Sequence, residues 1–369
     1  MNINTFKAIY PNTSFITEPE SYFEGVKNEY IELKENGFFN KDGEELLYIY
    51  QIQTADRSFL GLVAAVSVHD FINGHIKGHE ETLLAKEQVH VNIVLRNRAF
   101  LKPVLLTYPH IHQISKVLET YISTHDALIS IEEDIHGQTH TFWQITESKI
   151  NEQLIEMFNK QVNVAYIADG HHRSSTTALL YNRLVGKPEQ QDFSTLLAAF
   201  FPSDQLIIEE FNRVVEIPDH ITDIAFMARL SKVCDITPLK TPHKPRKKHE
   251  MTMYLKREWF VLKWRNRLIK KYLSEGLVLD VNLLNIEILQ KILEVEDIKN
   301  DPDVRYIDGS AGINAVRIAA SKKDGAIGFC LYPVELDELM LVSDKGMLLP
   351  PKSTFFKPRL RNGLIIMDH

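Results

Sequence analysis

NVAYIADGHHRSSTTALL (residues 163–180) decides how the middle of this chain folds. The apolar run 162–168 predicts a buried strand, and the run 171–186, which ends at a glycine and is followed by Pro188, predicts a helix. The Asp-Gly pair between them predicts the turn. Strand–turn–helix is a building unit of α/β proteins. The two histidines and the arginine at the helix start either bind an anion or form the polar surface of an ordinary connection.

Strand and helix signals flank this unit on both sides. Alternating or apolar runs predict strands at 46–53, 58–68, 104–109, 127–133, 140–145, 196–201 and 205–215, and helical spacing predicts a helix over 147–161. After Pro218 the pattern changes to a helix, a hairpin over 251–264, an amphipathic helix over 280–296, a strand–helix–strand unit and a last apolar strand. We therefore expect a mixed α/β (α+β) chain. Its first domain spans 1–216, and a smaller α+β domain with a Pro-rich basic tail spans 217–369.

Composition and charge narrow the class of protein. The chain has 369 residues, of which 44% are hydrophobic and 25% charged, with a formal net charge of −7. No apolar stretch approaches the roughly 20 residues of a membrane span, and the N-terminus lacks a signal-peptide pattern. Cys234 and Cys330 are too few for a zinc cage and fit a reducing compartment. We expect a soluble cytoplasmic protein that binds neither membranes nor nucleic acid, the basic run 243–250 being a solvated loop.

A second copy of the strand–turn–helix plan provides a control. YIADGHHRSSTTAL (166–179) and YIDGSAGINAVRIA (306–319) share the strand, the Asp-Gly pair and the helix. The second copy has no histidine or arginine where its helix begins. The plan itself is therefore structural, and the question of function falls on His171, His172 and Arg173.

The helix start carries the chemistry of an anion site. Its backbone N–H groups and dipole attract negative charge, Gly170 allows close approach of the backbone, and the guanidinium of Arg173 suits phosphate oxygens. Asp169 could cap the helix, orient a histidine or hold a cation, and Ser174 offers a hydroxyl donor. In the alternative, these side chains only cap the helix. The anion hypothesis predicts that Arg173→Ala weakens binding of the phosphate-bearing ligand at least tenfold and leaves thermal stability almost unchanged.

Two further segments are candidates. NGHIKGHEET (73–82) places Lys77, His79, Glu80 and Glu81 on a loop or helix start, where a carboxylate is either solvated or acts as a general base or Mg²⁺ ligand. A further alternative is a metal site formed by His79, His171, His172 and Asp169. PPKSTFFKPRLRNGL (350–364) gathers Lys352, Arg359 and Arg361 in a segment that either packs as a loop or faces an anion. A P-loop, a kinase H-R-D set and a G-x-S-x-G elbow are absent from the sequence.

The combination of segments resembles a known bacterial family. IADGHHR (167–173), IKGHEET (76–82), GLVAAVSVHDFING (61–74), EFNRVV (210–215) and LPPKSTFFKPRLRNGL (349–364) together are similar to the domain-of-unknown-function 1015 family. That family is related to the free-serine kinases, which resemble the ParB/sulfiredoxin fold. The resemblance implies a ParB/sulfiredoxin-like first domain.

The resemblance also implies an activity. It points to phosphoryl transfer from ADP or ATP, with Mg²⁺, to the hydroxyl of free L-serine. Glu80, or Glu81 in its place, would be the base, with Asp169 and Glu80 as possible Mg²⁺ ligands. The segment from Asp169 to Ser174, with Gly170, His171, His172 and Arg173, would bind the nucleotide phosphates.

This sequence departs from the family pattern in three places. The stretch after HEET (79–82) lacks the usual charged helix start. The N-terminal segment FKAIYPNTSFITEPESYFEG lacks the usual P-P-Y-D-type and N-P-x-S-F-L-type motifs, and the segment GKPEQQDFS is shorter than its counterparts. These departures support an alternative, a catalytically altered protein of the same family that binds nucleotide or another small anion and has a regulatory role. The acceptor, the nucleotide, the metal and the oligomeric state stay open at this point.

Overall fold

The computed structural model describes residues 1–81, 84–133, 137–274, 276–323 and 325–368. The chain divides into two compact units. The first unit contains residues 1–207, 340–348 and 358–369, and the second contains 208–339 and 349–357. The sequence prediction placed one boundary near 216. The observed division differs because the chain returns to the first unit twice near its C-terminus, so the Pro-rich tail is shared between the units.

The first unit is built on a nine-stranded mixed sheet with the order β6-β11-β8-β12-β5-β4-β10-β9, to which β1 adds at β5. Its strands are β1 (Ile3–Asn4), β4 (Tyr48–Gln53), β5 (Ser58–Ser67), β6 (Ile76–Lys77), β8 (Val104–Tyr108), β9 (Ile129–Glu133), β10 (Gln138–Gln144), β11 (Ala165–Asp169) and β12 (Thr195–Pro202). The strands predicted over 46–53 and 58–68 pair antiparallel as β4 and β5, and those predicted over 127–133 and 140–145 pair antiparallel as β9 and β10. β11 is parallel to β6 and antiparallel to β8, which brings segments near 77, 105 and 167 side by side.

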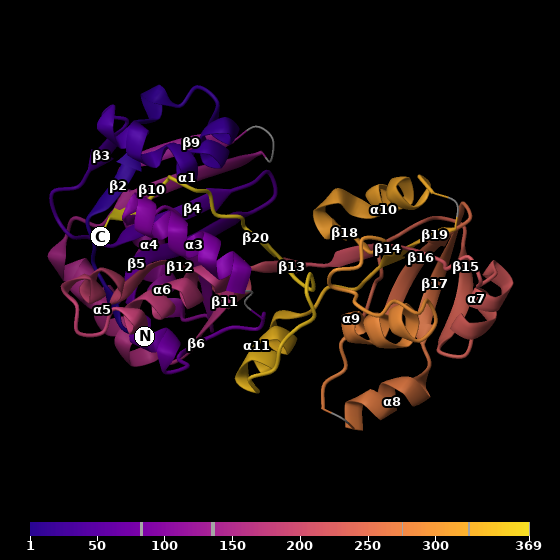
Figure 1. The fold of residues 1–369 in the computed structure, drawn as a ribbon. Coiled ribbons are helices and arrows are strands. Elements are labelled where there is room, and N and C mark those ends of the chain that lie inside the picture. Colours follow the sequence, from indigo (N-terminus) through magenta and orange to yellow (C-terminus); the bar gives the residue numbers. More distant parts are fainter. Residues whose placement is uncertain (82–83, 134–136, 275, 324, 369) are drawn as a thin grey trace. The chain divides into compact units, whose positions relative to one another are not determined.

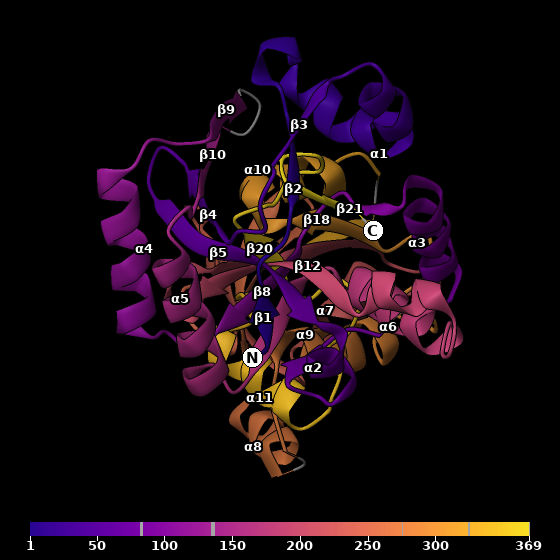
Figure 2. The same ribbon diagram turned by 90° about the vertical axis from the view of Figure 1, so that its left-hand side faces the viewer.

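Helices cover both faces of this sheet. Figure 2 shows α4 and α5 on one side of the strands and α3 and α6 on the other. The helical segments of the first unit are η1 (Thr13–Phe15), α1 (Pro19–Glu35), α2 (Val68–Ile72), α3 (Leu84–Asn97), α4 (His112–Thr124), α5 (Ser148–Gln161), α6 (His171–Arg183), η2 (Pro188–Phe193) and η3 (Ser203–Gln205). Because both faces are covered, β5 and β12 are apolar and buried along most of their length.

A small second sheet ties the C-terminus to the first unit. β3 (Phe39–Lys41), β2 (Ala8–Pro11), β21 (Ile366–Asp368) and β7 (Ala99–Phe100) pair in that order. The hydroxyl of Tyr30 in α1 donates to the carboxylate of Asp368 at 2.7 Å, and the backbone of β21 pairs with β2 and β7. The last residues of the chain are thereby held beside α1, where the C-terminal segment can contribute side chains to the first unit.

The second unit contains a six-stranded sheet with the order β15-β17-β16-β19-β14-β18. Its strands and helical segments are β14 (Phe211–Glu216), α7 (Asp223–Leu230), β15 (Cys234–Leu239), β16 (Glu250–Leu255), β17 (Glu258–Trp264), α8 (Asn266–Ser274), α9 (Asp280–Leu283), η4 (Leu284–Gln290), β18 (Arg305–Asp308), η5 (Gly309–Ala311), α10 (Gly312–Ala320) and β19 (Ala326–Cys330). α10 packs on this sheet through Val316 and Ala320, in one cluster with Val214 and Tyr254 (Figure 1). β13 (Ile207–Glu209) pairs with β20 (Phe355–Lys357), and α11 (Leu336–Asp344) precedes the tail.

The mixed α/β class predicted from the sequence is confirmed. The likeness to the ParB/sulfiredoxin fold stays a prediction. The helix predicted over 280–296 begins as α9 but continues as the π-helical stretch η4 and ends at Gln290. Within the described residues, no helix combines the length and the apolar character needed to cross a membrane.

Candidate functional site

The candidate site lies where β11 ends and α6 begins. β11 is buried up to Ala168, and Gly170 takes a left-handed conformation (φ 108°, ψ 28°) that directs the chain into the helix. A Cβ atom at Gly170 would lie 2.7 Å from a terminal nitrogen of Arg173. The turn therefore needs glycine for two reasons, its positive φ and the arginine side chain that folds back over it.

The guanidinium of Arg173 is already bound within the protein. It donates to the backbone carbonyls of Lys102 at 3.1 Å and Pro103 at 2.5 Å, and to the carboxylate of Asp169 at 2.8 Å. The side chain of Arg173 is only 17% exposed. Arg173 thus connects α6 to the segment that enters β8. The sequence hypothesis treated Arg173 as a ligand for phosphate and did not foresee these internal contacts.

Asp169 is surrounded by three cations. Its carboxylate lies 2.8 Å from the guanidinium of Arg173, 3.3 Å from Nζ of Lys102 and 3.8 Å from Arg359. Burial alone would raise the pKa of Asp169, but these cations together hold that pKa well below its usual range. Burial lowers the pKa of Lys102 to about 8, with Asp169 opposing the shift. Three positive charges face one negative charge, so the cluster has positive charge in excess.

This cation cluster, defined as Lys102, Arg173 and Arg359 around Asp169, draws on distant parts of the sequence. Lys102 precedes β8, and Arg359 comes from the segment 358–369 that returns to the first unit. The sequence left the tail with Arg359 either as a packed loop or as an anion-facing segment, and in the structure Arg359 lies 3.8 Å from Asp169. Lys102 was not predicted, because a lone lysine before a strand carries no sequence signal.

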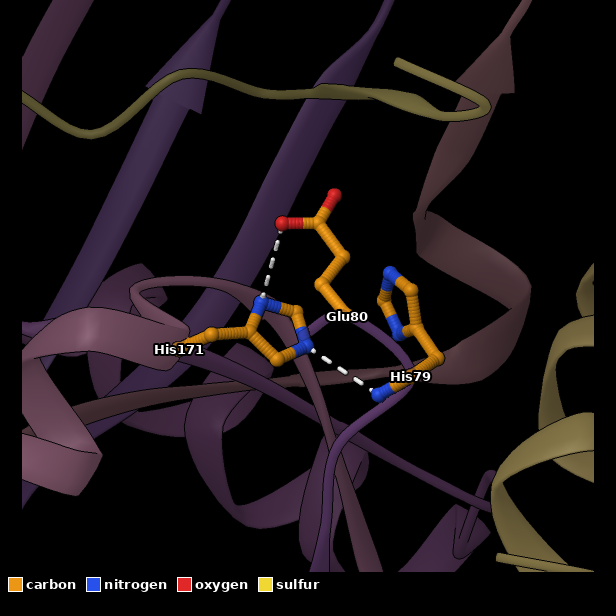
Figure 3. A group of neighbouring side chains, drawn as sticks. All are labelled: His79, Glu80 and His171. Carbon is orange, nitrogen blue, oxygen red and sulfur yellow. Dashed lines mark hydrogen bonds and ion pairs between the residues drawn. The ribbon is translucent and has the colours of Figure 1, made fainter. Parts of the chain in front are cut away.

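A second group forms next to the helix start. His171, the first residue of α6, accepts a hydrogen bond at Nε2 from the backbone N–H of His79 at 3.2 Å. Its Nδ1 lies 3.6 Å from a carboxylate oxygen of Glu80, and the rings of His79 and His171 meet edge to face at 4.5 Å (Figure 3). As predicted, residues 78–81 form a loop after β6. The parallel pairing of β6 with β11 brings this loop to the start of α6.

The protonation state of His171 follows from its contacts. Burial lowers its pKa to about 4, so the ring is neutral near pH 7. Since Nε2 accepts the N–H of His79, the single ring proton is on Nδ1 and points at the carboxylate of Glu80. The side chain of Glu80 is 40% exposed, whereas that of His171 is 6% exposed. The pair therefore presents an oriented carboxylate at the surface, with a neutral histidine behind it.

The same group offers metal-ligand atoms. One atom each from His79, Glu80 and His171 lies within 4.8 Å of the others, a set that resembles a His₂Glu zinc site. A metal bound to Nδ1 of His171 would put the ring proton on Nε2, where the N–H of His79 already points. The hydrogen bonding thus favours a carboxylate–imidazole pair. Asp169 is a poor ligand for Mg²⁺ because three cations surround it, whereas Glu80 has the carboxylate oxygens that Mg²⁺ prefers.

The remaining predicted site residues take several roles. The ring of His172 stacks on that of His90 in α3, with the ring centres 6.1 Å apart. Ser174 in α6 is fully buried. Lys77 pairs with Asp344 at 2.8 Å. Glu81 is exposed and follows Glu80 in the loop.

Lys352 belongs to the second unit, where its Nζ lies 5.1 Å from the ring centre of Phe211 and its carbonyl accepts from Arg213. Of the predicted residues, the candidate site therefore brings together His79, Glu80, Asp169, Gly170, His171, Arg173 and Arg359, and it adds Lys102. The sequence could not indicate which of the predicted histidines and hydroxyls would be turned inward.

Comparisons with known proteins give the following matches. A solved structure of SbnI with a C-terminal truncation, from Staphylococcus aureus, is 12% identical over 80% of this chain and 82% of that chain, with a TM-score of 0.42. A free serine kinase mutant in complex with AMP is 13% identical over 80% and 87%, with a TM-score of 0.37. A conserved hypothetical protein from Pyrococcus furiosus is 12% identical over 81% and 94%, with a TM-score of 0.35. Among curated proteins, no match was found.

A family model gives the assignment. The model described as a protein of unknown function, DUF1015, matches residues 2–286, which include the loop 78–81 and the whole start of α6. The match spans well over half of the chain and agrees with the resemblance seen in the sequence motifs. The chain therefore belongs to the DUF1015 family.

Proposed function

We propose that this protein is a small-molecule phosphotransferase, which moves a phosphoryl group from ADP or ATP to the hydroxyl of free L-serine. The observation that carries the proposal is the cation cluster, in which Lys102, Arg173 and Arg359 face the single carboxylate of Asp169. The free-serine acceptor is what the family resemblance implies.

The excess positive charge lies at a position suited to phosphate. The start of α6 supplies backbone N–H groups and the positive end of the helix dipole, and these add to the charges of Lys102 and Arg359. Arg359 is 37% exposed and Lys102 is 23% exposed, so both can reach a ligand at the surface of the cluster. Arg173 supports this surface from behind, since its donors are directed at the backbone before β8 and at Asp169.

Glu80 is placed to take the proton of the acceptor. The serine hydroxyl oxygen would attack the terminal phosphorus, the bond from that phosphorus to the nucleotide oxygen would break, and the hydroxyl proton would pass to the carboxylate of Glu80. The Nδ1–H of neutral His171 faces that carboxylate at 3.6 Å. Mg²⁺, when bound through Glu80 or Glu81 and the phosphates, would neutralise phosphate charge.

One observation favours a second candidate, a nucleotide-binding protein without turnover. The predicted phosphate ligand Ser174 is fully buried, and the guanidinium of Arg173 is occupied by internal contacts. Phosphate would then be bound by fewer side chains than the family resemblance implies. Both candidates bind phosphate at the cation cluster, but the second does not transfer a phosphoryl group to an acceptor.

Phosphorus NMR of the protein with Mg²⁺, ATP or ADP, and L-serine separates the two candidates. The phosphotransferase produces the resonance of O-phosphoserine. Glu80→Gln should slow its appearance by about 10²–10⁴-fold, the usual loss when a general base is removed, and should leave nucleotide affinity within about twofold. Glu81→Gln should retain the rate, and the converse pattern would assign the base to Glu81. Nucleotide binding without transfer to serine or another hydroxyl acceptor would favour the binding protein.

A further inference from the structure

A pocket of about 500 Å³ lies beside the cation cluster, between α1 and the C-terminal segment of the first unit. It is lined by Phe23, Glu24, Lys27, Asn28, Lys102, Leu360, Arg361 and Asn362. Lys102 belongs to both the pocket and the cluster, where its Nζ lies 3.3 Å from Asp169. A ligand with a phosphate at the start of α6 could therefore extend into this pocket past Lys102.

The lining of the pocket has a defined chemistry. Three of its side chains are cationic and one is acidic, two are amides, and Phe23 and Leu360 are apolar. The side-chain amide of Asn362 donates to the carbonyl of Phe23 at 2.8 Å, which joins the C-terminal segment to α1 across one wall. Cations, amides and an aromatic ring together suit an anion that also carries a planar or apolar part. A nucleotide has both.

Arg361 is held in the wall by a chain of buried hydrogen bonds. Its Nε donates to one carboxylate oxygen of Glu133 and one of its terminal nitrogens donates to the other, each at 2.6 Å. Nε2 of His140 lies 3.3 Å from the same carboxylate, and Nδ1 of His140 lies 2.7 Å from the hydroxyl of Tyr50. The side chains of Glu133 and His140 are 3% and 0% exposed.

The donors and acceptors along this chain are consistent. Burial lowers the pKa of His140, so the ring is neutral and carries one proton. Tyr50 donates to Nδ1, the Nε2–H donates to Glu133, and Glu133 accepts from Arg361. Arg361 has five N–H groups and directs two of them at Glu133, so the others can reach a ligand in the pocket, where the side chain is 18% exposed.

We propose that this pocket binds the nucleoside portion of a nucleoside diphosphate, that Arg361 and Lys27 contact its phosphate nearest the ribose, and that the chain Tyr50–His140–Glu133 is the positioning device for Arg361. The identity of the ligand rests on the proposed function, whereas the pocket and the chain do not. Lys102 links the pocket to the cation cluster, so one molecule spans both.

The test is a calorimetric titration of the full chain with ADP and with adenosine, for the wild type and three variants. Arg361→Gln should weaken ADP binding about tenfold or more and adenosine binding less than about twofold, since only the contact to phosphate is removed. Tyr50→Phe removes the hydroxyl that bonds both His140 and the backbone of Arg361, and it should weaken ADP binding about two- to fivefold. Lys34→Gln on α1, whose lysine pairs with Asp368, should bind ADP as the wild type does.

The positioning role has a separate readout. In the Arg361→Gln background, Tyr50→Phe should have no further effect on ADP affinity, because the chain then has no guanidinium to hold. Independent, additive losses would overturn the positioning role. Equal losses for ADP and adenosine in Arg361→Gln would show a structural effect and overturn the phosphate contact.

The pocket and the proposed function can fail separately. Wild-type ADP affinity in Arg361→Gln, together with weakened binding in Arg359→Gln, would overturn the pocket and leave the proposed function standing. ADP binding that depends on Arg361, without phosphoryl transfer to a hydroxyl acceptor, would support the pocket and contradict the proposed function. Failure of the wild type to bind ADP would overturn both.

Discussion

The two strand–Asp-Gly–helix copies of this chain have the same plan and different surroundings. In the second copy, the carboxylate of Asp308 accepts from the backbone N–H of Ala311 at 3.3 Å and from the hydroxyl of Ser310. Asp308 therefore caps the short helical turn η5 that leads into α10. These contacts of Asp308 all lie within the four residues 308–311, so a local turn accounts for them.

In the first copy, the side chain of Asp169 makes no cap to α6 and instead meets Lys102, Arg173 and Arg359. Two of these cations come from segments 67 and 190 residues away in the sequence. The comparison teaches that the Asp-Gly turn is a structural connector. The phosphate binding proposed for the first copy rests on charges that the tertiary fold brings to it.

The largest expected effect is on stability, from Arg173→Ala. The substitution removes the partner of Asp169 and leaves the carbonyls of Lys102 and Pro103 without the guanidinium. Breaking a buried ion pair costs about 3–5 kcal/mol, and we expect the lower end because Asp169 is 31% exposed. Thermal unfolding should shift down by about 6–12 °C. This replaces the sequence-based expectation of an unchanged melting temperature.

The matched control is Arg317→Ala in α10 of the second copy. Arg317 is exposed and bonds only weakly, with its Nε 3.4 Å from the side chain of Asn314. The melting temperature should change by less than about 2 °C. Equal shifts for the two arginines would break the comparison.

The next effect is the pH dependence of stability, from His171. Its folded pKa of about 4 lies below the ordinary value of 6.5 because the ring is buried, so the unfolded chain binds more protons between these pH values. The stability contributed by neutral His171 is present above pH 6.5 and is lost as the pH falls towards 4. The full loss is about 3 kcal/mol.

Urea unfolding at several pH values, for the wild type and His171→Asn, measures this contribution. The variant should lose less stability than the wild type between pH 6.5 and 4, whatever its stability at pH 7. Burial also lowers the pKa of His140, and that contribution remains in both proteins. Burial lowers the pKa of His79 as well, but there His171 adds to the shift, so the variant also loses that part of the His79 contribution. Parallel pH curves would contradict the buried, neutral state of His171.

A smaller effect compares the two glycines. A Cβ at Gly170 or at Gly309 would lie 2.7 Å from a side-chain atom, of Arg173 and of Glu210 respectively. Only Gly170 also has a left-handed φ, of 108°. Gly170→Ala should therefore lower the free energy of unfolding by about 1–2 kcal/mol more than Gly309→Ala. Equal losses, measured by urea unfolding, would show that side-chain crowding decides both turns.

The smallest effect is that of Asp308→Ala. Removing the cap of η5 should cost about 1 kcal/mol of stability and leave nucleotide affinity unchanged. Thermal unfolding and an ADP titration check the two parts. A loss of ADP affinity in Asp308→Ala would show that the second copy also takes part in binding.

Much of the framework was predictable because its signals are local. The apolar run of β11, the Asp-Gly pair and the polar helix start all act within a few residues, and each formed as expected. The hairpin of β4 and β5 also formed, since alternation and a short linker fix it. Helix α1 was missed although Pro19 and the spacing of Phe23, Val26 and Tyr30 are typical of an amphipathic helix.

The composition of the site could be predicted only in part. Glu80 and His171 were chosen as separate candidates, and the parallel pairing of β6 with β11 makes them neighbours. Lys102 and Arg361 act through contacts with Asp169 and Glu133, which lie far away in sequence. Such contacts follow from the order of strands in the sheet and from the return of the C-terminal segment to the first unit. A short sequence motif predicts neither of these features.

The central claim is that the cation cluster at the start of α6 binds phosphate, and an ADP titration of wild type, Arg359→Gln and Arg317→Gln tests it most directly. Arg359 belongs to the cluster, is 37% exposed and lies 3.8 Å from Asp169. We predict that the wild type and Arg317→Gln bind ADP equally and that Arg359→Gln binds about tenfold more weakly. Equal affinity in all three proteins, or no binding by the wild type, would contradict the account.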